Sequence, residues 1–323
     1  MARLRDDPDS LFALVGAAAE GIGLVQSWVE KDFWITELLR SVAKPTDDVY
    51  AVFKGGTSLS KALRLTQRFS QDVDILVVVT TPLSKDFGSR SVDKRLKLIT
   101  SRASEDLGLE AQPVGAPTTG VKRYSRLEYP TRVPQDAISR DVLLEMGTRG
   151  SDIPESERMS VSSHIADYLQ QADPEALEEF EDLAPVEVRV LAPERTLAEK
   201  LSVLNTAGAR YPAGAGDLAR AVRHLYDIDA LLRSEHMKAK LEAEPTMIRR
   251  LTSEVERISR EEFDQWEPRP ASGFAAASIF DPTTEAGIAL RAAYEGDLPS
   301  LVYGHLPTFD GCLRTVRNCS ALL

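Results

Sequence analysis

The stretch KGGTSLSK at residues 54–61, followed ten residues later by DVD at residues 72–74, decides the fold of this chain. A glycine-rich turn after an apolar strand exposes backbone N–H groups that bind phosphate. Two aspartates separated by one residue project from the same face of a strand. Two oxygen ligands so placed suit Mg²⁺ bound to a nucleoside triphosphate. A phosphate turn followed by an acid pair is therefore typical of nucleotidyl transfer.

The residues around this stretch predict a strand, a turn, a helix and a second strand. Residues 49–53 are rich in β-formers and end at the glycines, and residues 58–68 are expected to form a helix. Residues 72–79 alternate, so Val73, Ile75, Val77 and Val79 share one face while Asp72 and Asp74 lie on the other. This order brings the phosphate turn and the acid pair to one edge of a sheet.

A third acid is expected on a neighbouring strand. The run DVLLEMG at residues 141–147 is apolar and strand-like, and its Glu145 lies directly before a glycine. Asp141 is on the same face of that strand, because the two positions differ by an even number. We favour Glu145 as the third metal ligand and keep Asp141 as the alternative.

Three further stretches accompany the first in a recognisable order. They are VEKDFW at residues 29–34, APERTLAEK at residues 192–200 and RHLYD at residues 223–227. Together with residues 54–74 they resemble the motifs of the AbiEii/AbiGii-type toxins, relatives of the MenT-type toxins within the polymerase-β-type nucleotidyltransferases. The gap of thirteen residues between Ser58 and Asp72 is at the long end of the superfamily pattern.

This resemblance extends the set of candidate site residues. It implies that Lys200 neutralises triphosphate charge and that Asp227 faces Lys200, whereas the residues alone are equally consistent with a surface lysine and an Arg223–Asp227 pair. The resemblance also points to Ser70 as a regulatory phosphorylation point. The candidate catalytic residues are Asp72, Asp74, Glu145, Lys200 and Asp227; the metal ligands are Asp72, Asp74 and Glu145; and the nucleotide-binding residues are Gly55, Gly56, Thr57, Ser58, Lys61 and Lys200, with Arg68 a weaker candidate.

Composition limits the class of protein. The chain has 323 residues, a net charge of −11, 43% hydrophobic residues and 28% charged residues, which is ordinary for a globular protein. It contains no apolar run of about 18 residues, and its beginning lacks the apolar core of a signal peptide. Two cysteines and four histidines do not make a zinc set. We expect a cytoplasmic protein without a membrane anchor.

Charge is distributed unevenly along the chain. Residues 85–150 carry twelve basic and nine acidic side chains, whereas residues 151–190 carry two basic and eleven acidic ones. A basic surface that shares a face with the acid pair would hold an RNA backbone. The basic residues considered for it are Lys122, Arg123, Arg126, Arg132, Arg140 and Arg149.

The expected fold is α/β (α+β): a nucleotidyltransferase-type mixed sheet with flanking helices over residues 1–190, then a helical lobe over residues 191–323. The resemblance implies a toxin of a toxin–antitoxin system that uses Mg²⁺ or Mn²⁺ to transfer NMP from an NTP to the 3′ end of tRNA. Its partners would then be tRNA, NTP and a cognate antitoxin protein, with a monomer favoured. The alternatives are a protein or small-molecule acceptor, or a non-catalytic NTP-binding module.

Overall fold

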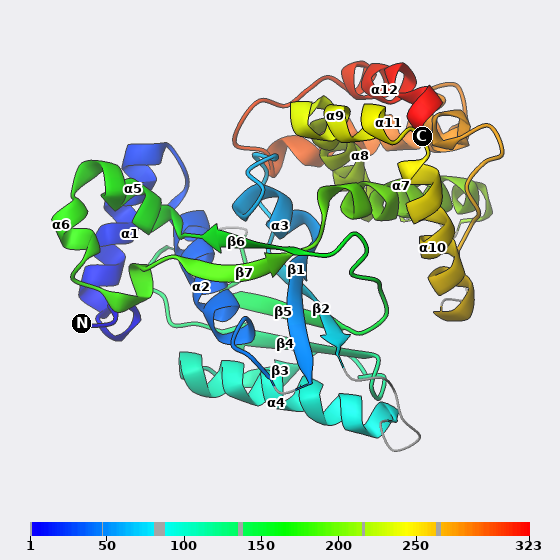
Figure 1. The fold of residues 1–323 in the computed structure, drawn as a ribbon. Coiled ribbons are helices and arrows are strands. Elements are labelled where there is room, and N and C mark those ends of the chain that lie inside the picture. The colour runs from blue at the N-terminus through cyan, green and yellow to red at the C-terminus, as the bar shows by residue number, and fades with distance from the viewer. Residues whose placement is uncertain (1, 47, 81–87, 135–137, 215–216, 263–265) are drawn as a thin grey trace. The chain divides into compact units, whose positions relative to one another are not determined.

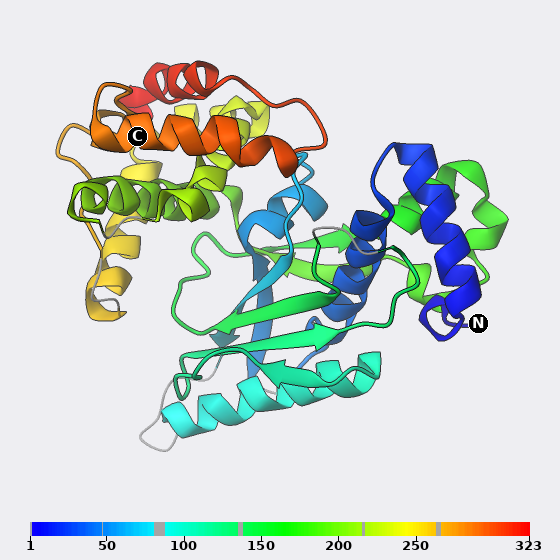
Figure 2. The ribbon, with the colours of Figure 1, turned by 180° about the vertical axis from the view of Figure 1, so that it is seen from behind.

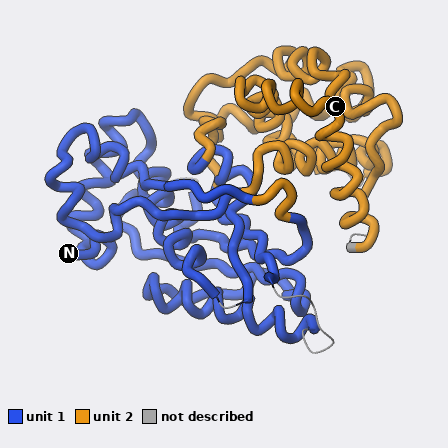
Figure 3. The backbone as a smooth tube through the Cα atoms, in the orientation of Figure 1, with its two compact units in different colours: residues 1–62, 71–151, 156–190 blue, residues 63–70, 152–155, 191–323 orange. Residues whose placement is uncertain are grey.

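The computed structural model describes residues 2–46, 48–80, 88–134, 138–214, 217–262 and 266–323. The chain divides into two compact units (Figure 3). Unit 1 comprises residues 1–62, 71–151 and 156–190, and unit 2 comprises residues 63–70, 152–155 and 191–323. Unit 1 is a mixed α/β unit and unit 2 is mainly helical.

Unit 1 is built on a seven-stranded mixed sheet in the order β3-β4-β5-β2-β1-β7-β6. Strand β2 is central: it runs antiparallel to β1 and parallel to β5. Strand β7 is parallel to β1, and the pairs β3–β4, β4–β5 and β6–β7 are antiparallel. The strands are β1 Val49–Lys54, β2 Asp72–Val79, β3 Ala111–Pro113, β4 Lys122–Glu128, β5 Asp141–Gly147, β6 Glu157–Val161 and β7 Val186–Val190.

Alternation along the strands separates an apolar face from a polar one. In β2, Val73, Ile75 and Val77 are buried, whereas Asp72 and Asp74 are partly exposed on the other face. Helices α2 (Gln26–Val42) and α4 (Ser89–Leu107) pack against the sheet and against each other (Figure 1). In the opposite view the strands lie in front of α2 (Figure 2). The expected mixed α/β fold is therefore confirmed.

The remaining helices of unit 1 are α1 (Pro8–Ile22), α5 (His164–Ala172) and α6 (Pro174–Leu177). Helix α1 begins with an Asp7 cap, which accepts from the backbone N–H groups of Asp9 and Ser10, and it ends at Gly23 in the left-handed region. Among the described residues no single helix is long and apolar enough to cross a membrane; α1 and α2 pass that test only as a pair, bent by 115°.

Unit 2 is organised around α8, which packs against α7, α9, α11 and α12, while α10 packs on α7. Leu225, Ile228 and Leu232 of α8 are buried, as expected for a helix that has neighbours on several sides. Its helices are α7 Pro193–Arg210, α8 Leu218–Arg233, α9 Glu235–Ala243, α10 Met247–Glu262, α11 Glu285–Gly296 and α12 Phe309–Asn318.

The helix expected over residues 58–68 is wrong in both limits. Helix α3 spans Gly55–Lys61, so it starts at the glycines and ends earlier. The chain turns after Lys61, with Arg64 at a φ of +52°, and residues 67–69 then pair with residues 301–304: the Phe69 N–H donates to the Leu301 carbonyl, and the Tyr303 N–H donates to the Gln67 carbonyl. These long-range backbone bonds override the helical periodicity of residues 62–68.

Candidate active site

Four side chains form a row across adjacent strands of unit 1. Lys54 of β1 is opposite Asp74 of β2, Asp74 is opposite Glu145 of β5, and Glu145 is opposite Tyr124 of β4. Directly opposed residues place their Cβ atoms about 4.5–5.5 Å apart on the same face. We call Lys54, Asp74, Glu145 and Tyr124 the acid row. Asp72 precedes it on the same face of β2 and is opposite Leu143.

The electrostatics of Tyr124 reflect the charges in the acid row. Burial raises the pKa of its hydroxyl, the charges of Glu145 and Asp74 raise it further, and Lys54 opposes them. The Tyr124 hydroxyl is therefore affected by the charges of the other three members of the acid row. A face that carries two carboxylates and one ammonium can bind a cation and the anion that accompanies it.

Gly55 allows the phosphate turn to approach the acid row. Its φ of +77° lies in the left-handed region, and a Cβ built there would overlap Oδ2 and Cγ of Asp74. Thr57 Oγ1 donates to the Asp72 carbonyl (2.5 Å), and Ser58 Oγ donates to the Gly55 carbonyl (2.9 Å). The turn at Gly55, Gly56, Thr57 and Ser58 is thus fastened to the strand start that carries both aspartates.

The two candidates for the third acid have different surroundings. Asp141 accepts from Arg126 Nε (2.8 Å) and from Ser139 Oγ (3.0 Å), and it is opposite Glu128 at the end of the sheet. Glu145 is instead in register with Asp74. The geometry therefore favours Glu145 as the partner of the aspartate pair and assigns Asp141 to an ion pair with Arg126.

The carboxylates are hard oxygen donors, the ligand type preferred by Mg²⁺ and Mn²⁺. Asp72, Asp74 and Glu145 share one face of β2 and β5, and the Asp74 carboxylate occupies the space that a Cβ at Gly55 would need. Within the described ranges no group of three or more His, Cys, Asp or Glu side chains is gathered closely enough to hold a metal ion. The three carboxylates are of the donor type that suits such an ion. Asp74 and Glu145 are also directly opposite each other in the β2–β5 pair.

Lys61 is engaged inside unit 1. Its ammonium contacts Asp32 Oδ1 (2.6 Å) and the Ser162 carbonyl (2.8 Å). Asp32 also accepts from the His164 backbone N–H (2.7 Å), so the end of α3, helix α2 and the start of α5 meet at one carboxylate. The sequence predicts that Lys61 binds phosphate, whereas in the structure its ammonium is paired with Asp32.

In unit 2, Lys200 and Asp227 form the expected pair. Lys200 Nζ lies 2.7 Å from Asp227 Oδ2, and Arg68 donates to both carboxylate oxygens at 2.7 Å. Burial alone would raise the pKa of Asp227, but the charges of Arg68 and Lys200 outweigh it and hold the pKa well below its usual range. Asp227 therefore stays ionised and fixes two cations, one from α7 and one from residues 63–70.

His224 completes this cluster as a neutral base. Burial and the Lys200 charge lower the pKa of His224 to about 3, and its Nδ1 lies 3.4 Å from Lys200 Nζ. The neutral ring can accept from the Lys200 ammonium at that position. The expected site residues Lys200 and Asp227 are thus joined, together with Arg68 and His224, by contacts within unit 2.

Other charges of the APERTLAEK stretch tie α7 to its neighbours. Glu194 accepts from Lys240 of α9 (2.6 Å), and Arg195 donates to Glu254 of α10 (2.8 Å). Both Glu194 and Arg195 are buried. This motif therefore holds the helical unit together as well as supplying Lys200.

The basic residues of β4 are divided between the two faces of the sheet. Arg123 is in register with the buried Met146 and pairs with Asp93 of α4 (3.2 Å), so it lies on the helix-covered face. Lys122 and Arg126 alternate with it and share the face of the acid row. Arg132 pairs with Asp9. Arg123 therefore does not belong to a basic surface that shares a face with the acid pair, and the prediction is wrong for this residue.

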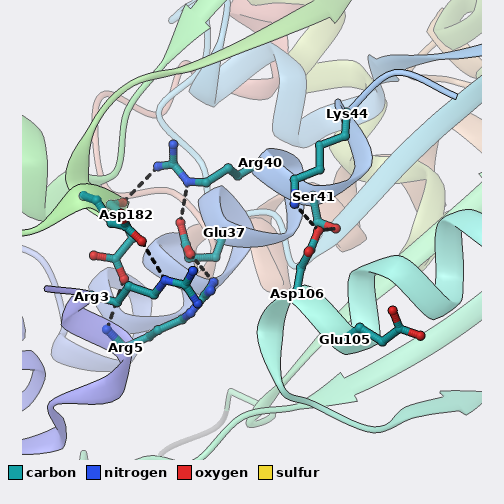
Figure 4. Close-up of a pocket in the computed structure, with 10 residues that line it drawn as sticks. Arg3, Arg5, Glu37, Arg40, Ser41, Lys44, Glu105, Asp106 and Asp182 are labelled. Atoms are coloured by element: carbon teal, nitrogen blue, oxygen red, sulfur yellow. Dashed lines mark hydrogen bonds and ion pairs between the residues drawn. The ribbon is translucent and has the colours of Figure 1, made fainter. Parts of the chain in front are cut away.

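A polar cavity of about 410 Å³ is a separate feature of unit 1 (Figure 4). Arg5 and Arg40 pair with Glu37, Lys44 pairs with Asp106, and Arg3 pairs with Glu181. None of the candidate site residues lines this cavity. Ion pairs within the lining thus account for its cations, Arg3, Arg5, Arg40 and Lys44.

Comparison with known proteins identifies the family to which the chain belongs. Residues 37–314 match the family described as "Nucleotidyl transferase AbiEii toxin, Type IV TA system". The chain therefore belongs to the AbiEii family of nucleotidyltransferase toxins. No curated protein matches the sequence significantly.

Among solved structures, MenT4, a nucleotidyltransferase toxin from Mycobacterium tuberculosis H37Rv, is similar in fold. It is 19% identical with a TM-score of 0.58, and the match covers 95% of this chain and 88% of MenT4. JHP933 from Helicobacter pylori is 12% identical with a TM-score of 0.36, over 73% of this chain and 96% of JHP933.

Sequence reasoning did not identify Lys54 and Tyr124 as members of the acid row. Lys54 was part of the quoted stretch, but its position opposite Asp74 depends on the β1–β2 register. Tyr124 depends on a third strand pair, β4–β5. A usable signal was the alternation of β4, which places Tyr124 on the same face as Lys122 and Arg126.

The close approach of Gly55 to Asp74 generates a paired prediction. Gly55→Ala adds both a strained φ and an overlap with the Asp74 carboxylate, so it should cost at least about 1–2 kcal/mol and abolish Mg²⁺-dependent binding of a fluorescent NTP analogue. Gly108→Ala is the matched control, because Gly108 has a φ of +66° with nothing near its Cβ. It should lose similar stability and bind normally. Normal binding by Gly55→Ala would contradict the role of this contact.

The lowered pKa of His224 generates a prediction about pH. Between its ordinary pKa of 6.5 and the folded value of about 3, the unfolded chain binds a proton that the folded chain does not. The free energy of unfolding should therefore fall with decreasing pH in this window, by up to about 1.4 kcal/mol per pH unit.

His224→Gln removes this titrating group, so the unfolded chain of the variant should bind one proton fewer relative to the folded chain. Urea unfolding at several pH values from about 5 to 6.5 should give a shallower slope for this variant than for the native protein. The Asp227 contribution is lost only below about pH 5, where a carboxyl with the ordinary pKa of 3.8 begins to be protonated in the unfolded chain, so it lies below this range. An unchanged slope would show that His224 is not the group responsible.

Proposed function

We propose that this toxin transfers a nucleoside monophosphate from an NTP to the 3′ end of tRNA, using a divalent metal ion held by Asp72, Asp74 and Glu145. The observation that carries the proposal is the register that aligns Asp74 with Glu145 next to Gly55. It supplies paired carboxylates beside a turn whose backbone N–H groups suit phosphate. A protein with this transfer to tRNA would act in the cytoplasm, where its product cannot be aminoacylated.

The chemistry requires little covalent participation by the protein. The terminal hydroxyl of the acceptor gives up its proton to water and its oxygen attacks the α-phosphorus. The bond from that phosphorus to the bridging oxygen breaks, and pyrophosphate leaves. A bound Mg²⁺ or Mn²⁺ would supply charge stabilisation and lower the pKa of the attacking hydroxyl. The chain's own contribution is to place the three carboxylates on one face of the sheet and to orient the phosphates at residues 55–58.

The charge of the triphosphate also needs cations from the protein. Within this proposal, Lys54 of the acid row fills that role in unit 1, with Lys61 available only if its pair with Asp32 opens, and the family resemblance assigns a nucleotide-binding role to Lys200. The supporting observation for Lys200 is its pairing with Asp227, which holds the ammonium in one place. An ammonium fixed before the reaction stabilises developing charge without reorganisation.

The acceptor is assigned by family resemblance and by charge. Lys122 and Arg126 share the face of the acid row, and cations on that face suit the phosphates of an RNA end. As a toxin of a toxin–antitoxin system, the chain is expected to have a cognate antitoxin protein.

A phosphate on Ser70, two residues before Asp72, would add about −1.5 to −2 charge and is proposed to inhibit metal binding.

The proposal is tested by incubating the purified protein with total tRNA, Mg²⁺ and each α-labelled NTP in turn. Native protein should transfer label to tRNA, and Asp74→Asn should reduce the rate at least about 100-fold, because several kcal/mol of charge stabilisation is lost. Glu128→Gln is the control, since this exposed acid lies on the same face at the end of β4 and should leave the rate unchanged.

Other outcomes would redirect the assignment. Label that appears on protein or on a small molecule, with none on tRNA, would overturn the tRNA acceptor and keep the transferase. A folded protein that binds NTP but labels nothing would contradict the proposed reaction. Transfer by Asp74→Asn at the native rate would remove the acid row from the active site.

A further inference from the structure

Three adjacent charged residues of α2, Glu30, Lys31 and Asp32, are buried, and the proposed chemistry uses none of them. Burying a charge is costly unless it is paired or hydrogen-bonded. Two of the three have simple structural partners. Asp32 pairs with Lys61 and accepts from the His164 backbone N–H, and Glu30 accepts from Thr131 Oγ1.

Lys31 is different because its near partners are mostly neutral. Its side chain is fully buried, and its ammonium donates to Gln71 Oε1 (3.1 Å), to the Ser139 carbonyl (3.2 Å) and to Ser139 Oγ (3.1 Å). The carboxylate recorded as its ion-pair partner, Asp141, is 3.9 Å away. Replacing a buried charge by an apolar side chain of similar volume is often neutral or stabilising, so stability alone does not account for a lysine at this position.

The partners of Lys31 belong to the starts of two strands. Gln71 directly precedes Asp72 in β2, and Ser139 lies two residues before Asp141, the first residue of β5. Ser139 Oγ lies 3.3 Å from Gln71 Oε1 and 3.0 Å from Asp141 Oδ1, so the contacts close into one cluster. Lys31 therefore binds both strand starts from a single helix position.

These two strands are the ones that carry the proposed metal ligands. Asp72 and Asp74 are on β2, Glu145 is on β5, and the strands are parallel neighbours without a hairpin to set their register. A change in register would move every side chain relative to its partner. Burial lowers the pKa of Lys31 to about 8, and the charges of Asp141 and Asp72 oppose that change.

We propose that Lys31 is a positioning residue of the carboxylate site, which aligns β2 with β5 through Gln71 and Ser139 so that Asp72, Asp74 and Glu145 face one metal ion. This inference rests on the metal site of the proposed function but not on the identity of the acceptor. Lys31 contacts neither substrate nor metal in this role and acts through the residues that it holds.

The test uses the full chain and Mn²⁺ as the probe. Mn²⁺ affinity is measured by electron paramagnetic resonance in the presence of a non-hydrolysable NTP analogue, and Tm is measured on the same samples. Lys31→Met should weaken Mn²⁺ binding roughly 10- to 100-fold, the range for residues that orient metal ligands. Its Tm should stay equal to that of the native protein or rise, because a buried ammonium is lost.

Two further variants separate positioning from stability. Lys31→Arg keeps donors for Gln71 and Ser139 and should recover part of the affinity. Glu37→Gln changes another buried charge of α2, whose partners are Arg5 and Arg40, so it should lower Tm and leave Mn²⁺ affinity unchanged. If Lys31→Met fails to fold, Gln71→Leu, which removes the acceptor next to Asp72, should show the same loss of affinity.

The results distinguish this inference from the proposed function. Native Mn²⁺ affinity in Lys31→Met, or in Gln71→Leu, would overturn the positioning role while the carboxylate site stands. A native protein that binds no Mn²⁺ with the analogue would overturn both. Native Mn²⁺ binding without label on tRNA would overturn only the assignment of tRNA as the acceptor. The comparison of Lys31→Met with the native protein would still test the positioning role.

Discussion

The parallel pairing of β2 with β5 is the constraint on which the candidate active site depends. It alone brings Glu145, which lies 71 positions after Asp74 in the sequence, directly opposite Asp74. The antiparallel pair β1–β2 then adds Lys54, and the β4–β5 pair adds Tyr124. The side chains of the acid row owe their proximity to backbone ladders, which are rigid and strongly specified where the opposite face of the sheet is buried.

Buried charges are the second organising feature, and each unit satisfies them internally. In unit 1, α2 directs Lys31 and Asp32 toward the starts of β2, β5 and α5 and toward the end of α3. In unit 2, Asp227 gathers Arg68 and Lys200. Removing one partner of a close buried pair, such as Asp32 with Lys61 or Asp227 with Arg68, costs about 3–5 kcal/mol, because the other charge is left uncompensated. The charged motifs of this chain therefore serve folding, in addition to the chemistry proposed for them.

Local patterns predict much of unit 1. Strands β2 and β7, helix α2 and the alternation of Asp72 and Asp74 with buried valines follow from periodicity over a few residues. Helix α3 did not follow, because the residues after Lys61 form backbone bonds with residues 301–304, more than 230 positions later in the chain. No local pattern contains such a partner.

The candidate site was predictable to the extent that its residues lie in motifs. The pair Lys200–Asp227 follows from family resemblance, but Arg68 as the second cation on Asp227 does not, since it requires the position of residues 63–70 on the helical unit. Arg123 shows the opposite error. Its charge suggested a nucleic-acid surface, whereas its position in the alternation of β4 places it on the other face of the sheet, where it pairs with Asp93. Sign and abundance of charge are readable from sequence; the face on which a charge lies requires the register.

The central claim is that Asp74 and Glu145, with Asp72, hold the metal ion of a nucleotidyl transfer. Crystals grown with Mn²⁺ and a non-hydrolysable NTP analogue, with anomalous diffraction recorded near the manganese edge, test it most directly. The account predicts an anomalous peak coordinated by Asp74 and Glu145, with phosphate oxygens at residues 55–58 and Asp141 still paired with Arg126. A nucleotide bound without a peak at these carboxylates, or a peak at Asp141 instead, would contradict it.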